Sequence, residues 1–186
     1  MSQEILEFLK NRTSAPRLEA PAPDGELLRD LFQAAFRVPD HARLRPWRFL
    51  CVSGDKRRDL GELMLDSLLQ RDPLADAAQR EKARSAPLRA PLVVVTIASP
   101  VEHAKVPACE QRWSAACATH ALLLAAESQG FAGVWRTGEA AFDRQLMTAL
   151  GLADTESIVG FLYLGTRIGM ARSAPEVAFE DKVTLW

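Results

Sequence analysis

The sequence predicts a layered domain of helices and strands around a mostly buried sheet of four or five strands. Three observations support this fold class. Helix and strand signals alternate along most of the chain, residues 92–98 (LVVVTIA) are apolar on both faces, and residues 109–129 form one long helical segment rich in Ala and Leu. With 186 residues, the chain is expected to form one domain, residues 1–186, with a core of its own.

The N-terminal half is expected to begin with two helices. Residues 2–11 have the pattern of a short amphipathic helix with Ile5, Leu6 and Leu9 on one side. After a loop with three prolines, Asp24 can cap a second helix that runs to about Arg37. The remaining elements expected in this half are a strand at 49–52, a helix at 55–70 and a weaker helix at 73–84.

The C-terminal half holds the most apolar segments. The middle of the helix at 109–129 is apolar nearly all round, which predicts burial in the centre of the fold or in an oligomer interface. Gly130 is a natural residue to end that helix. A strand at 131–135, a helix at 140–150 and a strand at 158–165 should follow. The tail, residues 166–186, has no strong period, and packing on a partner chain is one interpretation of it.

The charge balance argues against binding to nucleic acid or to an anionic membrane. Twenty-three basic residues meet 24 acidic ones, for a net charge of −1. The basic set contains 18 Arg and 5 Lys. Coding bias explains such a skew, but some of these arginines could bind phosphate or carboxylate, because the planar guanidinium group suits both anions.

Hydropathy and cysteine content favour a cytoplasmic protein. No stretch reaches the roughly 18 consecutive apolar residues of a membrane span. The N-terminus, MSQEILEFLKNR, is too charged for a signal peptide. Cys109 and Cys117 would lie about 12 Å apart along a helix, too far for a disulfide. A chain with only three cysteines is typical of proteins in a reducing compartment, where disulfides are rare.

Several common catalytic motifs are missing from the sequence. It contains no P-loop, no G-x-G-x-x-G and no G-x-S-x-G. The three histidines do not match the spacing of a zinc site, and no metal is expected. Cys117 and His120 share one helix face, but such a pair is more often part of a core than a catalytic nucleophile and its base.

Four clusters of anion-binding groups follow the ends of predicted elements. The first is Arg12-Thr13-Ser14, with Arg17 nearby; the second is the Arg-rich segment 37–48; the third is Trp135-Arg136-Thr137-Gly138; and the fourth is Leu164-Gly165-Thr166-Arg167. Ligands of layered sheets bind beyond strand ends, so the third and fourth clusters predict two walls of one phosphate-bearing site. Each cluster alone is also compatible with an ordinary solvated loop or turn.

Together these segments resemble the nitroreductase-like family of flavin oxidoreductases, especially its short, minimal YdjA-type branch. The family's R-[RT]-S corresponds to Arg12-Thr13-Ser14, and its A-P-D-H-x-x-x-Q-P-W to residues 38–47. The motif G-[GF]-x-G-x-W-R-[ST]-G appears at 130–138, and I-V-G-F-L-Y-L-G-T at 158–166. The four motifs occur in the family's order and span most of the chain.

The resemblance implies an α+β fold. It implies a three-layer α/β/α sandwich with a four- to five-stranded, mostly antiparallel sheet and a long central helix, and a homodimer that binds two FMN molecules in its interface. The residues implied at each FMN are Arg12, Thr13 and Ser14 from one subunit, Arg37 and His41 from the other, and Trp135, Arg136 and Thr137 on the opposite wall. Leu44, Arg45, Gly138 and Arg167 are also implied to bind the cofactor, and Arg45 is a candidate to stabilise the reduced flavin.

The implied activity is the transfer of a hydride from NADH or NADPH to FMN, followed by reduction of a nitroaromatic or quinone-type acceptor in the same pocket. The flavin carries the redox chemistry, which agrees with the missing catalytic motifs. No catalytic acid or base is singled out.

Two residues depart from the family pattern, because Arg45 replaces the usual Gln before Pro-Trp and Arg43 replaces an Asn of many longer relatives. Both positions are implied to lie at the flavin or the substrate. Three other functions would leave the same motifs: a flavin-binding protein without turnover, an enzyme that destroys or rearranges flavin, and an interaction module without a cofactor.

Overall fold

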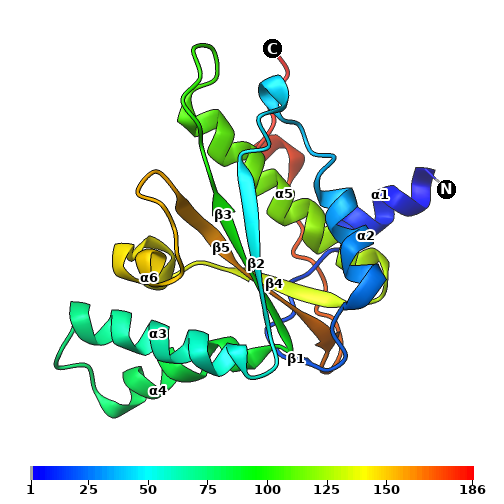
Figure 1. Ribbon diagram of the computed structural model, residues 1–186. Helices are drawn as coiled ribbons and strands as arrows, with labels where there is room; N and C mark the ends of the chain where they lie inside the picture. The colour runs from blue at the N-terminus through cyan, green and yellow to red at the C-terminus, as the bar shows by residue number, and fades with distance from the viewer. Residues whose placement is uncertain (1) are drawn as a thin grey trace.

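The chain folds into three layers, with a sheet between two groups of helices (Figure 1). The structure, a computed structural model, describes residues 2–186. The helices are α1 (Ser2–Lys10), α2 (Gly25–Ala35), α3 (Lys56–Arg71), α4 (Ala77–Ser85), α5 (Ala108–Ser128) and α6 (Arg144–Ala149). The strands are β1 (Leu18–Glu19), β2 (Trp47–Ser53), β3 (Leu92–Ala98), β4 (Ala132–Arg136) and β5 (Ser157–Arg167).

The sheet is built around β5. The order β1-β5-β3-β2 forms one path, and β4 also pairs with β5. All of these pairings are antiparallel. The α+β class and the mostly antiparallel sheet of four to five strands, expected from the resemblance, are therefore confirmed.

Two buried apolar clusters cover the two faces of the sheet. On one face, Val93 and Val95 of β3 pack with side chains of α3 and α6; on the other, Val94 packs with side chains of α2 and α5. Successive side chains of a strand point to opposite faces, so a strand covered on both sides must be apolar throughout. All seven residues of β3 are buried, as its sequence predicted.

Helix α5 is only partly buried within the protomer. One side carries Ala115, Leu122 and other buried residues, but Trp113 on the other side is 64% exposed. The expectation of burial in the centre of the fold is therefore wrong for that side, because small and apolar residues all round the helix do not show which sides are covered. The alternative, an oligomer interface, remains a prediction. Gly130 follows the helix at φ +83°, as expected for the residue that ends it.

Some element boundaries differ from the sequence expectation. Asp24 occupies the N-cap position of α2, but its side chain makes no capping hydrogen bond. The helix expected at 140–150 is split at Asp143, which accepts hydrogen bonds from the first backbone N–H groups of α6. Helix α4 begins at Ala77, rather than near 73, after the capping residue Asp76. The two-residue strand β1 was missed.

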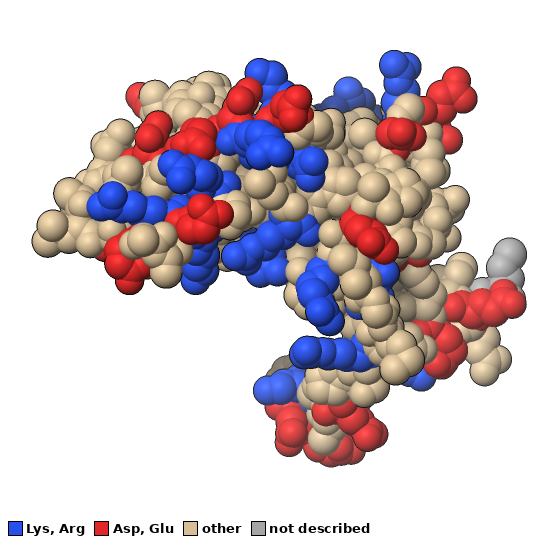
Figure 2. Space-filling model, turned by 90° about the horizontal axis from the view of Figure 1, so that it is seen from below, with Lys and Arg blue, Asp and Glu red and all other residues tan. Residues whose placement is uncertain are grey.

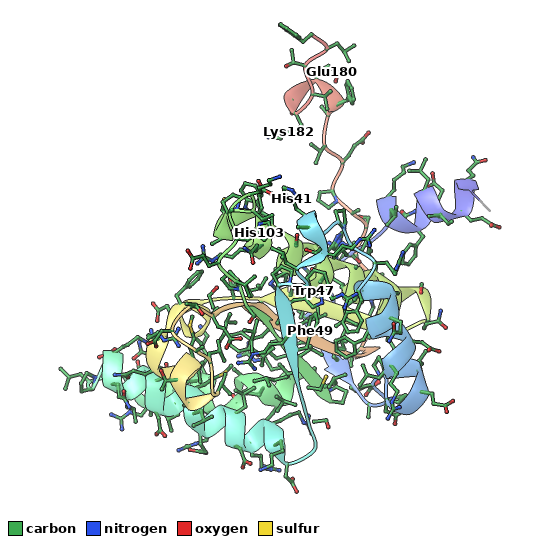
Figure 3. All side chains as sticks on the ribbon, turned by 45° about the horizontal axis from the view of Figure 1, so that its top comes forward. His41, Trp47, Phe49, His103, Glu180 and Lys182 are labelled. Atoms are coloured by element: carbon green, nitrogen blue, oxygen red, sulfur yellow. The ribbon has the colours of Figure 1, made fainter. Side chains whose placement is uncertain are left out.

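The tail leaves the body of the protomer. Figure 3 shows Glu180 and Lys182 on a segment that stands clear of the layers. Phe179 and Leu185 in this segment are exposed. Within residues 2–186, no helix combines the length and apolar character needed to cross a membrane.

Candidate flavin site

The loop after α1 lies against the first residues of β4. The backbone N–H of Ala15 donates a hydrogen bond to the carbonyl oxygen of Gly133 at 2.8 Å. Ala15 is fully buried and anchors the loop, while Arg12 and Thr13 are half-buried and Ser14 is exposed. The predicted Arg-Thr-Ser cluster is therefore anchored against β4, two residues before the third predicted cluster begins at Trp135.

Arg167 closes the same end of the site. Its Nη2 donates a hydrogen bond to the carbonyl oxygen of Thr13 at 2.8 Å, so the first and fourth predicted clusters are in contact. Both Arg12 and Arg167 line a cavity of about 390 Å³ together with Glu127. Among the described residues, the Arg12 guanidinium group makes no hydrogen bond or ion pair, and it is available to an anion.

Glu127 is the nearest negative charge to this pair of arginines. Burial raises the pKa of the Glu127 carboxyl, and the charges of Arg12 and Arg167 partly oppose that rise. Its buried Oε1 has no hydrogen-bond partner among the described residues. Glu4 and Glu7 line the same cavity, so an anionic ligand would depend on direct hydrogen bonds from the guanidinium groups rather than on the net charge of the cavity.

The second half of β4 has a free backbone edge. One side of β4 pairs with β5, and the carbonyl of Gly133 points to the other side, toward Ala15. Backbone groups alternate along an antiparallel strand, so the N–H and C=O of Trp135 point to the same side as those of Gly133. Gly138 follows at φ +69° with open space where a Cβ would stand. This edge can offer backbone hydrogen bonds to a ligand that approaches closely.

The side chains of Trp135 and Arg136 point to opposite faces of the sheet. Trp135 packs on the α2–α5 side, and its indole nitrogen is buried without a partner among the described residues. The Arg136 guanidinium group lies 5.6 Å from the centre of the Tyr163 ring, on the other side. Its buried Nε also lacks a partner among those residues. A contact of the Arg136 side chain with a ligand stays a prediction.

Four neighbouring cavities lie between Arg12 and Gly138. Each shares at least one lining residue with the next, through Arg167, then Arg17, then Arg89. The last cavity, of about 510 Å³, contains Thr137 and Gly138. We call this row of cavities the basic groove. Figure 2 views the molecule from the side of β1 and the α3–α4 pair, and shows Lys and Arg side chains gathered beside a hollow.

The second predicted cluster lies elsewhere in the protomer, between α2 and β2. Arg37 and Arg45 line a separate cavity of about 720 Å³ with the aromatic rings of Phe32, Phe36 and Phe49. This cavity shares no lining residue with the basic groove. Within one protomer, the structure therefore brings together three of the four predicted clusters.

The loop after α2 is held in a tight conformation. Arg45 has φ +50°, and its backbone N–H donates to the Asp40 carboxylate at 2.7 Å. His41 is exposed and its Nδ1 lies 2.8 Å from the Glu110 carboxylate of α5, while Leu44 is half-buried. In Figure 3, His41 lies beyond the end of β2, which carries Trp47 and Phe49.

Two cations of the basic groove, Lys82 and Arg89, were missed by sequence reasoning. Lys82 comes from α4 and Arg89 from the turn after it. Charged residues on an exposed helix are usually a solvated face, and no motif marks these two. Cys117 and His120 are exposed, so the interpretation of this pair as part of a core was also wrong. Within residues 2–186, no group of three or more His, Cys, Asp or Glu side chains could hold a metal.

Comparison with known proteins supports the reading of the motifs. The model of the nitroreductase family matches residues 9–166. A protein of Escherichia coli K12 named "Putative NAD(P)H nitroreductase YdjA" is 41% identical over 163 residues, which cover 88% of each chain. A relative from Haemophilus influenzae, also named as an NAD(P)H nitroreductase, is 34% identical over 96% of this chain and 95% of its own length.

Solved structures show the same fold at lower sequence identity. A nitroreductase-like protein from Bacillus cereus superposes with a TM-score of 0.83 at 20% identity, covering 98% of this chain and 95% of its own. The FMN-dependent nitroreductase NfnB from Mycobacterium smegmatis, solved with NADPH, gives a TM-score of 0.76 at 15% identity, covering 100% and 99% of the two chains. These similarities concern the fold.

Proposed function

The chain belongs to the nitroreductase family, and from this premise we propose that it is an FMN-dependent NAD(P)H oxidoreductase that reduces nitroaromatic or quinone-type acceptors. One observation carries the proposal. The basic groove has Arg12 and Arg167 at one end, and at the other Thr137 and Gly138, the two residues that follow β4.

The chemistry of the groove fits FMN. The phosphate needs charged donors, which the uncommitted Arg12 and the nearby Arg167 supply, with the hydroxyls of Thr13 and Ser14 beside them. A flat ring with carbonyl and N–H groups can hydrogen-bond to an unpaired strand edge, which β4 offers beyond Gly133.

The protein's own residues bind and orient in this mechanism. When bound, FMN accepts a hydride from NADH or NADPH and passes two electrons to the acceptor. The arginines at one end hold the phosphate, and the backbone at Trp135 and Gly138 positions the ring. No side chain of the groove is required as a nucleophile, and orientation and electrostatics are the protein's contribution.

A homodimer completes the proposed site. In a dimer, Arg37, His41, Leu44 and Arg45 of the α2–β2 loop would reach the flavin held by the other protomer's groove. Exposed apolar side chains support such an assembly, namely Ile5, Leu6 and Leu9 on α1, Trp113 on α5 and several residues of the tail. Leaving this much apolar surface exposed is costly, and burial against a second copy would remove the cost.

Steady-state kinetics test the proposed function. We expect the FMN-loaded protein to oxidise NADH or NADPH only when a nitroaromatic or quinone is present. Because donor and acceptor use one pocket in turn, double-reciprocal plots at several acceptor concentrations should be parallel. A yellow protein that transfers no electrons from either nucleotide to any such acceptor would instead be a flavin-binding protein without turnover, and the proposal would fail.

A further inference from the structure

The far end of the basic groove carries positive charge that a phosphate at Arg12 does not use. We propose that Lys82 and Arg89 bind a negatively charged group of the acceptor, so that the protein prefers aromatic acceptors that carry a carboxylate. This inference rests on the proposed function and names the substrate class of the same site.

The cavity at this end has the shape and surface of a small-molecule site. Its volume of about 510 Å³ lies in the usual range for such sites. Its apolar lining comes from Met64 and Leu68 of α3 and from Ala83 and Ala86 at the end of α4. Thr137 and Gly138 form the opposite wall, so a bound aromatic ring would lie next to the proposed flavin position.

The cations of this cavity differ in whether they are already paired. Arg71 is committed, because its guanidinium group bonds to the Asp143 carboxylate at 2.7 Å and the Glu139 carboxylate at 2.6 Å. Lys82 and Arg89 are exposed and make no side-chain hydrogen bond or ion pair with the residues that the structure describes.

The neighbourhood of Arg89 adds to the positive potential. Burial raises the pKa of the Tyr163 phenol, and the charges of Arg136 and Arg89 oppose the rise, so both guanidinium groups lie near this ring. The acidic side chain of the cavity, Glu139, pairs with Arg71, which also pairs with Asp143, so the three cations Arg71, Lys82 and Arg89 face two carboxylates. The cavity therefore presents uncompensated positive charge above an apolar floor.

This combination favours an aromatic carboxylate over a phosphate or a neutral ring. In the proposed function the FMN phosphate is bound by Arg12 and Arg167, which line a cavity that two further cavities separate from this one. The oxidised flavin ring carries no charge that would need two more cations. An apolar floor binds a flat ring, and a guanidinium group pairs with a carboxylate through two parallel hydrogen bonds.

The test compares two acceptors of nearly equal shape, 4-nitrobenzoate and the neutral 4-nitrobenzamide. With the FMN-loaded wild type, we expect kcat/KM to be about fivefold or more higher for the benzoate. The double variant Lys82→Met, Arg89→Met should lose this preference, because its kcat/KM for the benzoate falls to the level of the benzamide. Arg58→Met removes an exposed charge of α3 outside the groove and should leave the preference unchanged.

Equilibrium binding of acceptor analogues that cannot be reduced tests the anion site independently of turnover. Benzoate should bind to the wild type more tightly than benzamide in a calorimetric titration, and the double variant should lose the difference. If benzoate binds selectively while no nitro compound is reduced, the anion site stands and the proposed function falls.

Three results would overturn the inference. The first is equal kcat/KM for both acceptors in the wild type. The second is that the double variant loses kcat/KM equally with both acceptors and that the midpoint potential of its bound FMN falls. That result would assign the cations to the flavin. The third is an increased KM confined to NADPH, which would assign them to the donor.

Discussion

At the scale of single residues, Glu156 and Arg48 form the ion pair on which the acid stability of the fold depends most clearly. The Glu156 carboxylate accepts hydrogen bonds from Arg48 at 2.6 and 2.7 Å and from the backbone N–H of Ala153 at 2.9 Å. These bonds, the Arg48 pair first, lower the pKa of the largely buried Glu156 carboxyl to about 2. The pair links β2 to the loop that precedes β5.

The depressed pKa predicts a loss of stability in acid. The Glu156 carboxylate binds a proton more weakly in the folded state than in the unfolded chain. Its contribution to the free energy of unfolding is therefore complete above the unfolded pKa, about 4.3. The contribution is lost as the pH falls toward about 2. Urea unfolding should give a free energy that falls by about 2 kcal/mol over this interval because of Glu156 alone. In Glu156→Gln, the fall should be correspondingly smaller, and an unchanged pH dependence would contradict the assignment.

Arg12 and Arg167 also act at the residue scale, because each offers a guanidinium group to the proposed phosphate. Arg12→Ala should weaken FMN binding by about 1.5–3 kcal/mol, the usual value of a hydrogen bond to a charged group. Equilibrium dialysis of FMN measures this difference. Arg58→Ala, which removes an exposed arginine outside the groove, is the control and should bind FMN like the wild type. Equal affinity of the Arg12 variant would exclude it from the site.

At the scale of elements, the sequence predicted segments with strong periodicity and missed features set by tertiary contacts. Strand β3 could be predicted, because a strand covered on both faces must be apolar. Strand β1 has two residues and is defined only by its pairing with the end of β5. The exposed side of α5 could not be read from its composition, since Ala and Leu occur on every side of the helix.

The candidate site was predictable to a similar degree. Arg12, Thr13 and Arg167 belong to motifs at element ends, and the structure brings them together. Lys82 and Arg89 lie in no motif, and their position in the groove follows from how the α3–α4 pair packs beside Gly138. Such a juxtaposition depends on the fold and leaves no signal in a single sequence.

The contact between β4 and β5 gives a prediction at this scale. A Cβ added to Gly160 would overlap the Trp135 indole nitrogen and lie 2.9 Å from the Arg136 carbonyl oxygen. Gly160→Ala should therefore lower the free energy of unfolding by about 2 kcal/mol or more and disturb β4. Chemical denaturation measures the loss. Gly169→Ala has open space around the new Cβ but a φ of +81°, so a smaller loss of about 1 kcal/mol is expected there. A loss at Gly160 no larger than that at Gly169 would show that the Trp135 side chain moves aside at little cost.

At the scale of the whole molecule, the apolar side chains left exposed in the protomer argue for a second chain. Leu6 is 55% exposed and Trp113 is 64% exposed, on helices that are well formed and amphipathic or apolar. The predicted particle has twice the 20.5 kDa mass of the chain. Its two flavins would each take residues from both protomers, since the α2–β2 loop shares no cavity with the groove of its own chain.

Sedimentation velocity tests the assembly. The wild type should sediment as a dimer, and Trp113→Glu should shift it toward the monomer and lower FMN affinity at the same time. Leu74→Glu changes a still more exposed apolar residue between α3 and α4 and should leave both properties unchanged. A monomer that retains FMN at full occupancy would contradict a site shared between subunits.

The visible spectrum of the purified protein tests the central claim, a redox-active FMN in the basic groove, most directly. The account predicts flavin absorbance that bleaches when NADH or NADPH is added without oxygen and returns when a nitroaromatic or quinone follows. A colourless protein whose melting temperature does not rise with added FMN would contradict it.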